Sequence, residues 1–181
     1  MAIMKEIFGY LQRLKEGNEK YLTTNTAIVN VSPQIREKTA RNGQSPYAVV
    51  ITCSDSSVIP EAIFSAGIGK LFVIRTAGNT IEGTTLGSIE YAVEHLGVKL
   101  IVVLGHTHCG AIETVLCNHE EAHGNLGRIV NEISKAVAHE QDPYTAVKLN
   151  VEHGVKLFRK MNFQPLWLGL FIIRILAGLN F

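Results

Sequence analysis

The sequence has few cysteines, no excess of either charge and no long hydrophobic run. Its 181 residues include 3 widely spaced cysteines, and 17 basic side chains stand against 16 acidic ones. Such a cysteine set is not a disulfide framework, and this charge balance lacks the basic footprint of a nucleic-acid-binding protein. The most apolar stretch, 166–179, contains Arg174 and is shorter than the roughly 20 residues that a spanning helix needs. We therefore expect no nucleic-acid partner and no membrane span.

The N-terminal residues 1–6 lack the charged-then-apolar layout of a secretory signal, so we expect a cytoplasmic protein. The length suits one domain with a sizeable core. Helical patterns alternate with short apolar runs, which predicts right-handed crossovers and an α/β fold: a single domain with a central, mostly parallel sheet flanked by helices. We expect strands at 47–52, 71–75, 100–105 and 166–173, and helices at 3–22, 33–41, 60–66, 84–96, 110–118, 125–139 and 143–160. Within the domain 1–181, these elements give an N-terminal helical arm (1–42), an α/β core (47–173) and a divergent tail (174–181).

Two polar segments follow two of these strands. Cys53-Ser54-Asp55-Ser56 comes after the strand 47–52, and His106-Thr107-His108-Cys109-Gly110 after the strand 100–105. Ligands of open parallel sheets bind at the carboxyl ends of the strands, where both segments are expected. Two thiolates and one imidazole are ligands that suit zinc, with a fourth position left open. The alternative is that both cysteines are ordinary buried thiols, but their placement at two apposed strand ends favours a metal site.

These motifs resemble the β-class carbonic anhydrases, and so do further segments between residues 8 and 170. The segments are 11–18, 60–61, 71–79 and 87–93. The resemblance implies one Zn²⁺ per subunit on Cys53, His106 and Cys109. It also implies reversible hydration of CO2 to bicarbonate and a proton by zinc-bound hydroxide, and a homodimer or higher oligomer. Zinc lowers the pKa of bound water to about 7, and Asp55 stands where the family has its catalytic aspartate. Gly78 and Asn79 are expected to form a turn beside the metal and to meet the substrate.

The chain departs from the family pattern Cys-x-Asp-x-Arg at Ser57. The missing arginine pairs with the aspartate in a bidentate contact. Serine is too short to replace it, so Asp55 would either bind zinc as a fourth ligand in a closed form or be poorly anchored. Arg75 could replace the missing arginine by residue type, but nothing in the sequence places it within reach of Asp55. We therefore expect weak hydratase activity. The alternatives are a tolerated substitution of modest effect, an inactive zinc-binding homologue, or a hydrolase of CS2 or COS.

Three further features carry less of the argument. His108 should point away from the metal, and Cys117 reads as a small buried hydrophobe. The apolar ending 172–181 differs from the polar turn and charged strand of the family. One explanation is a single-base frameshift near Phe171, and the other is a genuine apolar terminal strand.

Overall fold

Four parallel strands form the centre of the molecule, in the order β2-β1-β3-β4. The computed structural model describes residues 2–24, 29–117, 122–137, 139–160 and 171–177. The strands are β1 (Ala48–Cys53), β2 (Leu71–Thr76), β3 (Leu100–His106) and β4 (Phe171–Ala177). The helices are α1 (Ala2–Thr24), α2 (Pro33–Asn42), α3 (Pro60–Ile63), α4 (Gly83–Glu94), α5 (Gly110–Cys117), α6 (Gly124–Val137) and α7 (Pro143–Lys160), with a 3-10 turn η1 (Ala77–Asn79).

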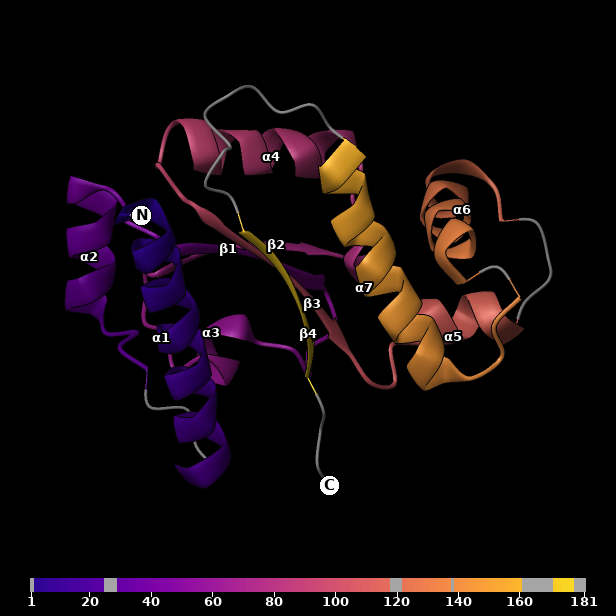
Figure 1. The fold of residues 1–181 in the computed structure, drawn as a ribbon, viewed down its shortest axis with the longest axis horizontal. Helices are drawn as coiled ribbons and strands as arrows, with labels where there is room; N and C mark the ends of the chain where they lie inside the picture. The colour runs from indigo at the N-terminus through magenta and orange to yellow at the C-terminus, as the bar shows by residue number, and fades with distance from the viewer. Residues whose placement is uncertain (1, 25–28, 118–121, 138, 161–170, 178–181) are drawn as a thin grey trace.

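Helices cover both faces of this sheet (Figure 1). Successive strand side chains point to opposite faces, so neighbouring residues of β1 belong to different cores. Val50 packs in a cluster with Ile7 and Leu14 of α1. Val49 packs in a second cluster, with Ile89 of α4, on the opposite side. Burial on both sides explains why every residue of β1 and β3 is buried.

A third cluster of buried residues lies at the carboxyl ends of β1 and β3, where α5, α6 and α7 meet. Its members are Cys53, Cys109, Ile112, Ile133, Val137, Ala146 and Val147. In Figure 1, α5 and α6 extend beyond α7 at this end of the molecule. The helices therefore enclose the strand ends on which the sequence places its metal motifs.

The predicted fold class is confirmed, and most of the predicted elements end within two residues of the observed ones, with 143–160 matching α7 at both ends. Ser32 caps α2 as its sequence suggests, accepting a bond from the Ile35 amide at 3.4 Å. The helix predicted at 60–66 is wrong in length and ends at Ile63. Ser65 adopts a left-handed backbone with φ 46 instead, and its hydroxyl bonds the Gly17 carbonyl at 2.8 Å.

The fourth strand also differs from its prediction. It runs parallel to β3 from Leu100 opposite Phe171 to His106 opposite Ala177. It therefore continues past 173 into the segment expected to be a tail, because the apolar sequence there extends the ladder. The start of the predicted strand, 166–170, lies outside the described residues. None of the helices in the described ranges combines the length and the hydropathy of a membrane span.

Candidate metal centre

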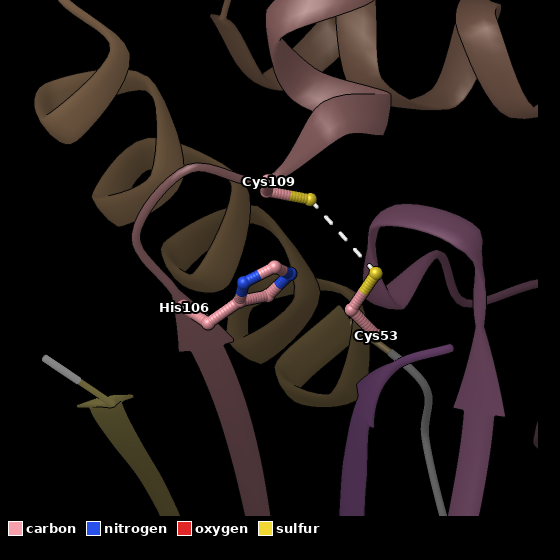
Figure 2. Close-up of side chains that lie close together, drawn as sticks. All are labelled: Cys53, His106 and Cys109. Carbon is pink, nitrogen blue, oxygen red and sulfur yellow. Dashed lines mark hydrogen bonds between the residues drawn. The ribbon is translucent and has the colours of Figure 1, made fainter. Parts of the chain in front are cut away.

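Cys53, His106 and Cys109 converge at the carboxyl edge of the sheet. Cys53 is the last residue of β1, His106 is the last residue of β3, and Cys109 directly precedes α5. The sulfur and imidazole nitrogen atoms of this cluster all lie within 4.8 Å of one another. Figure 2 shows the three side chains facing a common point. All three residues are buried, with exposures of 5%, 1% and 1% respectively. The structure thus brings together the three side chains that the sequence pairs with a metal.

Adjacent strands hold the two motifs side by side. β1 and β3 are hydrogen-bonded neighbours in which Thr52 pairs with Leu104. The buried Thr52 hydroxyl also donates to the Leu104 carbonyl at 3.0 Å. This contact lies one residue before Cys53 and two before His106, so it fixes the separation of the strand ends just where the ligands begin.

A tight turn then returns the chain from His106 to Cys109. His108 occupies it with a left-handed φ of 54, and the Cys109 carbonyl accepts from the amides of Ile112 and Glu113 as α5 begins. The His108 side chain is 83% exposed, and its Nδ1 lies 3.6 Å from a Glu113 carboxylate oxygen. The prediction that His108 points away from the cluster is confirmed.

The buried imidazole of His106 supports a metal at this position. Among the described residues, neither its Nδ1 nor its Nε2 has a hydrogen-bond partner. Leaving a buried polar atom without a partner costs about 1–3 kcal/mol, and one coordinate bond to a cation would satisfy one of these nitrogens. Two sulfurs beside an imidazole are the donor set of zinc. The residues present therefore fit Zn²⁺.

The two sulfurs of the cluster are hydrogen-bonded to each other. The Cys109 thiol donates to the Cys53 sulfur across 3.9 Å. This contact is the main reason that the pKa of Cys53 falls to about 4, and it raises the pKa of Cys109 above its ordinary value. Cys53 also accepts a bond from the Gly78 amide at 3.4 Å. Cys53 is therefore the thiol of the pair that loses its proton more readily, and the thiolate is the form that binds metals.

The turn η1 packs against this sulfur. The predicted turn at Gly78 and Asn79 is present, and both residues have left-handed φ values, 62 and 46. Asn79 is 3% exposed, and its side-chain nitrogen has no hydrogen-bond partner among the described residues. The Gly78 carbonyl accepts from the buried Asn150 amide of α7 at 2.8 Å.

The Asp55 carboxylate is held by Ser57. Its Oδ1 accepts from the Ser57 amide at 2.9 Å and from the Ser57 hydroxyl at 2.7 Å. The hydroxyl contact is the first cause of a lowered pKa at Asp55. We expected serine to leave this carboxylate without an anchor, and the structure supplies two donors to one of its oxygens. In the described chain, the carboxylate is not part of the Cys53, His106 and Cys109 cluster, so its role as a fourth ligand in a closed form remains a prediction.

Arg75 reaches the same segment through its backbone. Its Nε donates to the Cys53 carbonyl at 3.1 Å and its Nη2 to the Asp55 carbonyl at 2.6 Å. These bonds fix the main chain between the thiolate and the carboxylate. They place the guanidinium on carbonyl oxygens, with no bond to the Asp55 side chain.

Comparison with known proteins decides the family. The family model described as carbonic anhydrase matches residues 48–163. Carbonic anhydrase 2 of Mycobacterium tuberculosis (strain H37Rv) is 50% identical over 126 residues, covering 69% of this chain and 59% of that protein. The chain belongs to the carbonic anhydrase family. The carbonic anhydrase of Mycolicibacterium smegmatis is 39% identical over 127 residues, covering 68% of this chain and 61% of that protein. The chain therefore spans about three fifths of the length of these curated relatives.

Solved structures identify the class as β. A tetrameric β-carbonic anhydrase of Sordaria macrospora aligns with a TM-score of 0.68 at 25% identity, over 94% of this chain and 91% of that one. The Coccomyxa β-carbonic anhydrase aligns with a TM-score of 0.62 at 24% identity, over 93% of this chain and 82% of that one, and shows the fold alone. The resemblance that the sequence motifs suggest is thereby confirmed.

Sequence reasoning missed two contacts around this site and misjudged the burial of one cysteine. The bonds from Ser57 to Asp55 depend on the geometry of a turn, and the amino-acid composition of the turn does not predict that geometry. Asn150 lies about 70 residues from the turn that it holds, and no local motif joins the two. The prediction that Cys117 is buried is wrong, because it is the last residue of α5 and is exposed. Ile112 lies on the packed face of that helix. Cys117 follows five residues later, so the helical rotation places it on a different, exposed face.

Proposed function

We propose that this chain catalyses the reversible hydration of CO2 to bicarbonate and a proton, with one zinc ion per subunit held by Cys53, His106 and Cys109. The observation that carries this proposal is the convergence of two sulfurs and a buried imidazole that has no hydrogen-bond partner in the described part of the chain. Family membership supports the reaction. When bound, zinc supplies a Lewis acid that lowers the pKa of water to about 7, so that a nucleophile exists at neutral pH.

The chain's own residues orient the reactants and accept the proton. Asp55 has one oxygen, Oδ1, engaged by Ser57, and its Oδ2 has no hydrogen-bond donor among the described residues. Oδ2 therefore keeps its lone pairs free, and we assign it as the atom that accepts a proton from the attacking water. Arg75 keeps the backbone beneath this carboxylate in place. We propose that the turn at Gly78 and Asn79 meets the substrate, with the buried Asn79 side-chain amide, which has no partner among the described residues, donating to an oxygen of CO2 or bicarbonate.

Two histidines at the carboxyl end of β3, one in the strand and one in the following turn, provide a matched test. Zinc content is measured by mass spectrometry and CO2 hydration by stopped flow in wild type, His106→Ala and His108→Ala. We expect His106→Ala to lose both zinc and hydration, because its imidazole is the only nitrogen ligand in the cluster. His108→Ala should keep both, since its side chain is exposed. Wild-type protein that binds no transition metal, or a His106→Ala variant with full zinc content, would refute the proposal.

Ser57 favours a second candidate, a zinc protein with weak or absent hydratase activity. The family resemblance places arginine at this position, and Arg75 bonds the carbonyls of Cys53 and Asp55 instead of the carboxylate. Hydrogen bonds from Ser57 anchor one carboxylate oxygen without adding positive charge. The Asp55 carboxylate thus lacks the bidentate, charge-assisted contact that an arginine makes.

Ser57→Arg tests this candidate, with Ser56→Arg as its control in the same exposed turn. If the missing guanidinium limits the rate, Ser57→Arg should raise kcat/KM for CO2 at least tenfold, and Ser56→Arg should not. Equal rates in wild type and Ser57→Arg would refute the idea that the absence of an arginine beside Asp55 limits the activity. Assays of wild type with CS2 and COS under the same conditions decide whether either compound is the better substrate.

We also propose that the working form is a homodimer or a higher homo-oligomer. A structural neighbour from Sordaria macrospora is tetrameric. Helix α1 carries large apolar side chains on its outer surface, with Ile3 50% and Phe8 56% exposed in the single chain. Light scattering during size-exclusion chromatography should give a mass of at least twice the 19.9 kDa of one chain. A monomer at micromolar concentration would refute this assignment.

A further inference from the structure

Asn150 is joined to the Cys53 sulfur through a single glycine. Its amide nitrogen donates to the Gly78 carbonyl at 2.8 Å, and the Gly78 amide donates to Cys53 Sγ at 3.4 Å. Asn150 lies in the middle of α7 and is 4% exposed. We propose that Asn150 is a positioning residue for the metal ligand Cys53, acting by fixing the peptide that donates to its sulfur.

The first step of the argument is that Gly78 needs an anchor. The two hydrogen bonds engage the peptide units on either side of its Cα, so together they set both of its dihedral angles. Gly78 has a φ of 62, a conformation that glycine adopts at little cost but also leaves easily. Because glycine has no side chain to pack, the bond from Asn150 is what keeps the Gly78 amide directed at sulfur.

The second step is that neighbouring helices pack closely around Gly78. A Cβ at Gly78 would lie 2.7 Å from Ile133 Cδ1 of α6 and 3.4 Å from the Ala111 Cβ of α5. Three helices thus enclose the turn, and α7 supplies the polar contact. Asn150 is a costly residue to bury unless its polar atoms are used, and its donor is engaged at this carbonyl alone among the described residues.

The third step concerns what an N–H bond does to a sulfur ligand. A donor aimed at a thiolate withdraws electron density from it, so the sulfur gives up an electron to a metal less easily. Groups around a metal site that orient its ligands typically change metal affinity by about 10- to 100-fold when they are mutated. Asn150 therefore tunes the site without touching the metal or the substrate. The inference rests on the proposed metal centre.

The test uses Co²⁺ as a spectroscopic substitute for zinc in the full chain. The charge-transfer band from sulfur to Co²⁺ is compared in wild type, Asn150→Leu, Asn150→Asp and the control Val151→Ala. Val151 is the next residue of α7 and is 1% exposed. It packs in the cluster that contains Val49 and Ile89, and not against Gly78. Both Asn150 variants should shift the band to lower energy and bind zinc about 10- to 100-fold more weakly. Val151→Ala, which only loosens packing, should leave the band in place.

The outcomes separate this inference from the proposed function. Wild-type protein that binds neither Co²⁺ nor Zn²⁺ would refute the metal centre itself. Wild-type binding with unchanged band energy and affinity in both Asn150 variants would overturn the positioning role alone. If neither variant folds, ¹¹³Cd-loaded wild type decides the matter by NMR. A scalar coupling between ¹¹³Cd and the Gly78 amide proton through sulfur supports the contact, and its absence overturns it.

Discussion

Gly78→Ala should destabilise the protein by an amount that the structure allows us to divide into two parts. A residue with a side chain pays about 1–2 kcal/mol in the left-handed region that Gly78 occupies, with its φ of 62. The new Cβ would also lie 2.7 Å from Ile133 Cδ1. Overpacking of this kind costs about 1–3 kcal/mol. We expect the free energy of unfolding to fall by about 2–5 kcal/mol, the sum of the two.

A second substitution removes only the overpacking. Ile133→Val deletes the Cδ1 atom, and it costs about 0.5–1.5 kcal/mol alone because Ile133 is fully buried. In the double variant, the nearest remaining atoms to the new Cβ are Ile133 Cγ1 and the Ala111 Cβ, both at 3.4 Å. These are ordinary contacts. The loss of stability in the double variant should therefore be smaller than the sum of the two single losses by about 1–3 kcal/mol.

Urea unfolding followed by circular dichroism measures the four free energies, with chelator present so that bound metal does not add to stability. Gly87→Ala is the control, because Gly87 is an exposed position of helix α4 and a Cβ there would have nothing within 4 Å. It should raise stability by about 0.5–1 kcal/mol. The loss in the double variant could instead equal the sum of the two single losses within about 0.5 kcal/mol. In that case Ile133 Cδ1 does not clash with the new Cβ, and the packing around this turn is wrongly described.

Three further predictions concern the ligands and one buried carboxylate. With zinc bound, a thiol reagent should modify the exposed Cys117 quickly and the buried Cys53 and Cys109 only after a chelator is added; fast reaction of all three thiols in the zinc form would contradict the ligand assignment. Zinc present at about 100 times its dissociation constant should add about 2.7 kcal/mol of stability, so an unchanged Tm after chelation would argue against a metal in the folded chain. Burial would raise the pKa of Glu132, but its bonds to Lys135 and His153 lower it below 4.5. The loss of stability in Glu132→Gln should therefore be full above pH 4.5 and shrink as the pH falls through the lower folded pKa, whereas a pH-independent loss would refute this account.

The central sheet and the metal cluster were within reach of sequence reasoning because their signals are local. Runs of apolar residues mark the strands, and parallel strands bring their carboxyl ends to one edge. Cys53 and His106 end two such runs, so their proximity follows once β1 and β3 are neighbours. Glycine and proline mark most helix ends, and the errors there are small.

Contacts between distant segments were not predictable in this way. Arg75 was considered only as a type of residue, because nothing local indicates that it reaches the carbonyls of Cys53 and Asp55. The bonds between Ser57 and Asp55 depend on turn dihedrals that the sequence leaves open. The bond from Asn150 depends on how α7 crosses the sheet, which only the folded chain defines.

The pairing of β1 with β3 constrains how this chain can change in length. Their register is pinned by the ladder and by the Thr52 hydroxyl on the Leu104 carbonyl. A single residue inserted or deleted within β1 would turn every later side chain of that strand to the opposite face, exchanging the two apolar cores and carrying the thiolate away from the imidazole. Insertions and deletions tolerated during divergence should therefore fall in the connections between these strands and never inside them.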